Sequence, residues 1–110
     1  MPQSLGEFEQ MVLLAILHVK GEVYGVPIVE EIESRTGRAV SRAAVYVTLR
    51  RLEKRGLISS WMSDPTGERG GKARLCVKIE PEGLTLLTQS RRAMERMWDD
   101  LDPRMLEGRP

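Results

Sequence analysis

Apolar residues recur at helical spacing along most of the chain, and the first such stretch is unusual because no polar face interrupts it. The pattern predicts a helix that begins near Leu5, behind a capping box of Ser4 and Glu7, and ends at Gly21. Residues 11–17 are apolar on every side, and a helix without a polar face needs neighbours all round it. A small domain can cover only one side, so the pattern indicates a partner chain on the other.

Two amphipathic helices are predicted next. The second helix covers residues 26–35, with Pro27 tolerated in its first turn. The third begins after Ser41, a good N-cap, and is terminated by Gly56. Its apolar stripe, at positions i, i+4 and i+7, consists of Val45, Leu49 and Leu52. One face of the third helix therefore belongs to a core, and the opposite face needs another explanation.

After Gly56 the apolar period changes from helical to alternating. Residues 57–62 and 73–79 form two predicted strands, and turn formers fill residues 63–71. In the second strand the apolar members alternate with the others, as Leu75, Val77 and Ile79 against Arg74, Cys76 and Lys78. The pattern predicts a hairpin with a long, basic tip.

A fourth helix is predicted to open at Pro81 and to run to Leu101, while residues 102–110 are expected to fray. Its apolar positions, mostly three or four residues apart, are Leu84, Leu87, Met94, Trp98 and Leu101. Together with the uncovered side of the first helix, this stripe predicts the surface through which two copies pair.

Three helices, a hairpin and a further helix follow the element order of a winged helix-turn-helix. The predicted fold class is mainly α with a small β-hairpin. Residues 1–80 are expected to form a winged helix-turn-helix DNA-binding domain, and residues 81–110 a C-terminal dimerisation helix. In such a fold the third helix enters the major groove and the hairpin touches the flanking backbone.

The net charge of +1 hides two regions of opposite sign. Residues 35–74 contain ten basic and three acidic residues, whereas the rest of the chain contains seven basic and thirteen acidic residues. This segregation indicates a basic surface for a polyanion. A chance cluster on exposed helix faces is the alternative.

The solvent side of the third helix has an apolar centre. The side chains most opposed to its apolar stripe are Ala43, Val47, Arg50 and Lys54. Small apolar groups there are suited to base edges and thymine methyl groups. The predicted DNA contacts of this helix are Ser41, Arg42, Ala43, Tyr46, Val47, Arg50, Arg51 and Lys54. In the hairpin they are Arg69, Gly70, Lys72 and Arg74. The alternative is an ordinary amphipathic helix with Tyr46 half-buried beside the core.

Four segments carry a further signal: "LGEFEQMVLLAIL", "VYGVPIVEEI", "AAVYVTLRRLEKRGLI" and "IEPEGLTLL". In this order and spacing they resemble the PadR-like transcriptional regulators, and the single helix after the wing resembles the compact branch of that family. The family often has proline directly after the recognition-helix tyrosine, where this chain has Val47. The resemblance implies transcriptional regulation through a winged helix.

The predicted function is therefore a sequence-specific regulator, and more narrowly a repressor. It is expected to bind a pseudo-palindromic operator on double-stranded DNA as a homodimer that pairs through the first and fourth helices. Each recognition helix reads only a few base pairs, so pairing supplies the affinity that one copy lacks.

The fourth helix leaves two interpretations of Trp98 open. Some compact members of the family bind planar, often cationic, aromatic compounds between such tryptophans, which implies an effector pocket. Its residues would be Met94, Met97, Trp98, Asp99 and Asp100. The alternative is that Trp98 fills the dimer interface, because an aromatic side chain at helical spacing is usually core.

Other classes of function are disfavoured by the residue inventory. A single cysteine, Cys76, and a single histidine, His18, leave no disulfide, no metal cluster and no activated nucleophile, so neither an enzyme nor a cofactor is expected. The longest apolar run is too short to cross a bilayer and no secretory signal is visible, which predicts a cytoplasmic protein. The remaining rival is a winged-helix module that binds protein without sequence-specific DNA binding.

Overall fold

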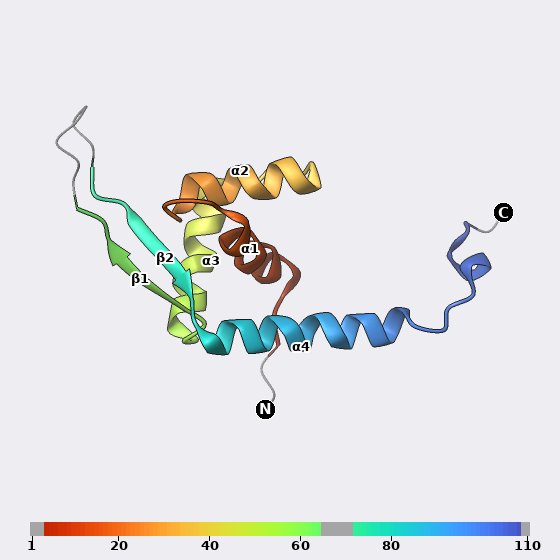
Figure 1. Ribbon diagram of the computed structural model, residues 1–110. Helices are drawn as coiled ribbons and strands as arrows, with labels where there is room; N and C mark the ends of the chain where they lie inside the picture. The colour runs from red at the N-terminus through yellow and green to blue at the C-terminus, as the bar shows by residue number, and fades with distance from the viewer. Residues whose placement is uncertain (1–3, 65–71, 109–110) are drawn as a thin grey trace.

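The computed structural model describes residues 4–64 and 72–108. Figure 1 shows three helices gathered into one body, a hairpin that projects from it, and a long helix that leaves it. The helical elements are α1 (Glu7–His18), α2 (Gly25–Thr36), α3 (Arg42–Lys54), α4 (Pro81–Trp98) and a short 3-10 helix η1 (Pro103–Leu106). The strands are β1 (Ile58–Met62) and β2 (Leu75–Ile79), which pair antiparallel. The predicted order of elements is confirmed.

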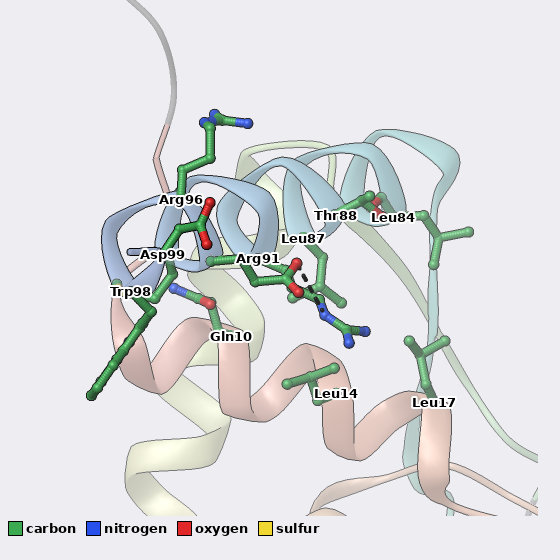
Figure 2. Close-up of a pocket in the computed structure, with 12 residues that line it drawn as sticks. Gln10, Leu14, Leu17, Leu84, Leu87, Thr88, Arg91, Arg96, Trp98 and Asp99 are labelled. Carbon is green, nitrogen blue, oxygen red and sulfur yellow. Dashed lines mark hydrogen bonds and ion pairs between the residues drawn. The ribbon is translucent and has the colours of Figure 1, made fainter. Parts of the chain in front are cut away.

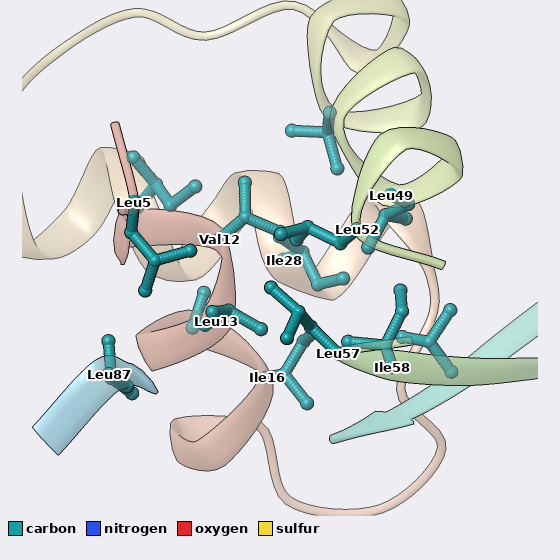
Figure 3. Packing of buried hydrophobic residues seen from close by; sticks show 14 of the residues in the cluster. Leu5, Val12, Leu13, Ile16, Ile28, Leu49, Leu52, Leu57, Ile58 and Leu87 are labelled. Atoms are coloured by element: carbon teal, nitrogen blue, oxygen red, sulfur yellow. The ribbon is translucent and has the colours of Figure 1, made fainter. Parts of the chain in front are cut away.

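The core is centred on α1. Its residues Val12 and Leu13 are completely buried, and Figure 3 shows them among side chains from α2, α3 and the start of β1. Burial of a side chain of this size contributes about 1.5–3 kcal/mol. The predicted stripe of α3 is buried in this core, as Val45, Leu49 and Leu52. The opposite face of α3 is therefore left to the solvent.

The start of α1 differs from the prediction. The N-cap is Gly6, and the carboxylate of Glu9 accepts a hydrogen bond from the backbone N–H of Gly6 at 2.9 Å. The predicted capping box of Ser4 and Glu7 is therefore wrong. A glutamate at the third helical position supplies the cap instead, so the helix begins two residues later than expected.

The end of α1 is also earlier than predicted, at His18 rather than Gly21. The chain becomes extended at Val19 because its continuation runs beside the hairpin. There the backbone N–H of Val77 donates to the carbonyl of Val23 at 3.0 Å. The segment between α1 and α2 is thus linked to β2.

The predicted limits of α3 are confirmed. The hydroxyl of Ser41 accepts a hydrogen bond from the backbone N–H of Ala44 at 3.0 Å, as an N-cap does. At the other end Gly56 has a φ of 74°, a conformation that favours glycine and stops the helix.

The end of α4 and the residues after it differ from the prediction. The helix ends at Trp98 rather than Leu101, so Asp99 and Asp100 follow the helix instead of lying on it. Asp100 has a φ of 59°, which turns the chain away from the helix axis. Residues 103–106 then form η1, although this segment was expected to fray. A local cap, described below, explains its order.

Cys76 is only 1% exposed, although alternation placed it on the solvent side of β2. Val77, which points to the opposite face, is 2% exposed, so both faces of β2 are covered at this point. Burial raises the pKa of the Cys76 thiol, and the nearby carboxylate of Glu22 adds to the effect. The side chain is structural in this fold.

Candidate nucleic-acid interface

The residues predicted to contact DNA from α3 all lie on its exposed side. They are Ser41, Arg42, Ala43, Tyr46, Val47, Arg50, Arg51 and Lys54. Tyr46 and Val47 expose 53% and 54% of their surface, so Tyr46 does not pack beside the core as the alternative interpretation required. An exposed valine and tyrosine at the middle of this face add nothing to the core of the fold. Their position favours contact with a ligand.

Cations surround this apolar centre. Within residues 4–64 and 72–108, Arg42, Arg51 and Lys54 make no ion pair. Arg50 lies 3.5 Å from the carboxylate of Glu53, an exposed pair that contributes little to stability. The same carboxylate accepts a hydrogen bond from the hydroxyl of Ser60 on β1 and so links the helix to the hairpin. The solvent face of α3 therefore offers several guanidinium and ammonium groups to an anion.

Arg55 belongs to the same basic stretch but points the other way. Its Nη1 donates to both carboxylate oxygens of Glu9, at 3.1 and 2.9 Å, and its Nη2 donates to the carbonyl of Ser4 at 2.7 Å. The Arg55 and Glu9 side chains are only 23% and 12% exposed. This pair fixes the end of α3 against the start of α1. The sequence analysis did not predict this ion pair. Its only sign in the sequence was the position of Glu9 just before the apolar residues 11–17, where a carboxylate needs a partner.

In the hairpin, Lys72 is exposed and makes no ion pair with another described residue. Arg74 is already engaged, because its guanidinium lies 4.4 Å above the ring of Tyr24 and 3.2 Å from the carboxylate of Glu22. These contacts tie β2 to the segment before α2. The other two predicted wing residues, Arg69 and Gly70, lie outside the described residues.

A groove of about 1050 Å³ separates α1 from α4. Figure 2 shows Leu84 opposite Leu17 at one end, and Trp98 near Gln10 at the other. On the α1 wall, Leu14 and Leu17 are 45% and 50% exposed. The side of α1 that was predicted to need a neighbour is thus uncovered in the single chain.

The five predicted effector residues fall into two groups. Met94, Trp98 and Asp99 line the groove, whereas Met97 and Asp100 do not. Met97 is 75% exposed and Trp98 is 59% exposed. An aromatic ring and a thioether of α4, and a carboxylate directly after it, therefore line the same groove.

Other kinds of site have little support in the described part of the chain. There, no helix is both long and apolar enough to span a bilayer, and no three His, Cys, Asp or Glu side chains are grouped as metal ligands would be.

Comparisons with known proteins agree with the geometry. The model of the "Transcriptional regulator PadR-like family" matches residues 13–89, a range that includes α3 and the hairpin. The transcriptional regulator Rv3488 of Mycobacterium tuberculosis is 38% identical over 94 residues, which cover 83% of each chain. A transcriptional regulator of known structure from Clostridium thermocellum is 25% identical with a TM-score of 0.67, and 81% of each chain is covered. The PadR-like regulator BC4206 from Bacillus cereus shares the fold, with a TM-score of 0.69, 22% identity and 93% of each chain covered.

Proposed function

The chain belongs to the PadR-like family of transcriptional regulators, and on this premise we propose that it is a homodimeric repressor of a pseudo-palindromic operator. The observation that carries the proposal is the solvent face of α3, where exposed Tyr46 and Val47 are ringed by arginines and lysine. Such a face is suited to the major groove, in which both base edges and thymine methyl groups are accessible. DNA is the target, so the site of action is the cytoplasm.

The residues on this face divide into two roles. Tyr46, Val47 and Arg50 are proposed to read bases, because they lie at or beside the centre of the exposed face. Arg42, Arg51 and Lys54 are proposed to contact phosphates, together with the predicted residues of the hairpin tip. Phosphate contacts set the position on DNA, and base contacts set the sequence.

The homodimer is supported by the apolar side chains that α1 and α4 leave exposed. Leu14 and Leu17 on α1 and Met94 and Trp98 on α4 line one groove. A second copy that inserts its own α4 there would cover both walls. Residues 1–80 would then bind DNA and residues 81–110 would dimerise, with half-sites about 34 Å apart.

The first experiment measures fluorescence anisotropy with DNA from the region upstream of the protein's own gene. We expect binding that weakens steeply with salt. Arg51→Ala should weaken this binding, whereas Arg92→Ala should not; Arg92 is an exposed arginine on α4 that lies outside the groove and serves as the matched control. Absence of binding at low salt would reject the proposal and favour a winged-helix module that binds protein. A reporter fused to the same region would show whether bound protein lowers transcription.

The base contact is tested by replacing single thymines of the operator by uracil, which removes only the methyl group. If Val47 touches one of these methyl groups, the replacement lowers the DNA affinity of the wild-type protein about threefold or more. The affinity of Val47→Ala should then be nearly unchanged. Equal losses in both proteins would show that Val47 does not contact that methyl group.

A second candidate function, release by an effector, is favoured by the open groove beside Trp98 and Asp99. Planar cationic dyes serve as probes, and binding would quench tryptophan fluorescence and release DNA. A Trp61→Phe background leaves Trp98 as the only emitter, since the chain has two tryptophans. If Trp98→Ala released DNA on dye addition as the parent does, Trp98 would be a part of the dimer interface alone.

A further inference from the structure

The segment after α4 forms an ordered turn without the help of the rest of the chain. Asp102 caps η1, because its carboxylate accepts a hydrogen bond from the backbone N–H of Arg104 at 2.9 Å. The guanidinium of Arg104 returns to the same carboxylate at 2.8 Å, and Pro103 occupies the first position of the turn. Figure 1 shows η1 beyond the far end of α4, away from the hairpin.

This turn presents apolar side chains to the solvent. Met105 and Leu106 are 68% and 59% exposed, and Leu101 just before them is 39% exposed. Exposing two large adjacent apolar side chains to water is unfavourable, and covering them with another surface would stabilise the protein.

A surface of matching size lies between α1 and α2. It is a hollow of about 130 Å³ whose apolar lining is Met11, Leu14, Ala15 and Ile32. In liquid water each molecule takes up about 30 Å³, so the hollow has the volume of about four water molecules. This is enough for one large aliphatic side chain. Leu14 lines both this hollow and the groove between α1 and α4. A chain that lies in the groove can therefore continue into the hollow.

We propose that η1 of one protomer covers the α1–α2 hollow of the other, with Met105 or Leu106 inserted into it. This proposal rests on the homodimer of the proposed function. If the two-fold axis of the dimer is perpendicular to the two α4 helices, these helices are antiparallel. The end of one α4 then lies near Leu84 and Leu17 of the other protomer, next to His18 on the rim of the hollow.

Charge supports the same pairing. Arg35, on the rim of the hollow, lies 2.6 Å from Glu31 and is still 55% exposed. Glu107 directly follows the turn and is exposed. In the proposed arrangement Glu107 of one protomer approaches Arg35 of the other, while the apolar side chains fill the hollow. Symmetry makes this contact twice in each dimer.

Cysteine cross-linking between two different copies tests the contact directly. One protein carries Leu106→Cys and the other carries Thr36→Cys, which lies on the lining of the hollow. After the two are mixed and oxidised, a disulfide-linked dimer is expected on a non-reducing gel. Neither protein alone should give that product, because Cys76 is buried. The matched control replaces Thr36→Cys by Glu30→Cys, which is exposed on α2 but does not line the hollow.

Light scattering on the same samples separates the two proposals. A dimer that cross-links through Thr36→Cys no better than through Glu30→Cys would overturn the tail contact and leave the dimer intact. A monomer at micromolar concentration would reject the dimer and the tail contact together. In a second measurement, Met105→Ser with Leu106→Ser should raise the dimer dissociation constant at least about tenfold. Met62→Ser, on an exposed methionine of β1 that lies outside both cavities, should leave it unchanged.

Discussion

Replacing Arg55 by methionine removes the charged partner of a carboxylate that is almost completely buried. Glu9 is 12% exposed in its side chain and accepts three hydrogen bonds, two from Arg55 and one from the backbone of Gly6. Methionine retains much of the apolar stem of arginine, so the loss of packing is small. The variant therefore isolates the ion pair.

The expected loss follows from what Glu9 retains. Breaking a fully buried pair costs about 3–5 kcal/mol, because an uncompensated charge is left behind. Glu9 keeps one hydrogen bond and some contact with water, so we expect Arg55→Met to lower the free energy of unfolding by about 2–3 kcal/mol. For a domain of this size that corresponds to a fall in Tm of roughly 10–20 °C.

Thermal and urea unfolding at one fixed protein concentration measure the loss, with Glu9→Gln and the double variant completing a cycle. Glu9→Gln removes the charge and can still cap α1, so the double variant should be more stable than Arg55→Met alone. A loss below about 0.5 kcal/mol for Arg55→Met, or additive losses in the cycle, would refute the reasoning. Either result would mean that Glu9 is solvated and that the contact does not hold α3 against α1.

Three further outcomes are expected. Lys72→Ala should lower the affinity for all DNA sequences by a similar factor and reduce the slope of log affinity against log salt by about one unit. A change in sequence preference alone would contradict the phosphate contact. Gly83→Ala should destabilise the fold by about 1–3 kcal/mol in urea unfolding, because a Cβ there meets the carbonyl of Leu57 and lies 2.9 Å from Ile79, whereas Gly108→Ala has open space and should be neutral. Burial raises the pKa of the Cys76 thiol above its ordinary value of 9.0, so the unfolded chain loses this proton first and the free energy of unfolding should begin to fall as pH rises through 9.0; a flat profile above pH 9 would contradict the burial.

Local patterns in the sequence were sufficient for most of the fold. The stripe of Val45, Leu49 and Leu52 and the cap at Ser41 each depend on residues within two helical turns, and the structure confirms them. Glu9 and Arg55 are 46 positions apart, so no local pattern could show that Arg55 leaves the basic face to pair with Glu9.

Contacts between distant segments also explain the other differences. The chain is extended after α1 and reaches β2, where the backbone N–H of Val77 donates to the carbonyl of Val23, and Cys76 of the same strand is buried. Arg74 was predicted to contact phosphate, yet Tyr24 and Glu22 already hold it, and both lie about fifty positions earlier. Periodicity describes which face of an element is apolar, but it does not identify the neighbour that covers it.

The attachment of α4 has a mechanical consequence. Only Gly83, Leu86 and Leu87 of its 18 residues are buried, all in its first two turns, so the helix is a lever clamped at one end. From Leu87 to Trp98 it extends about 16 Å at 1.5 Å per residue, and a tilt of about 10° at the clamp displaces Trp98 by about 3 Å. This anchored end rests on Leu57, which lies between α3 and β1. In the proposed dimer, a change of about 10° where the two copies meet would therefore change the separation of their α3 helices by about 3 Å.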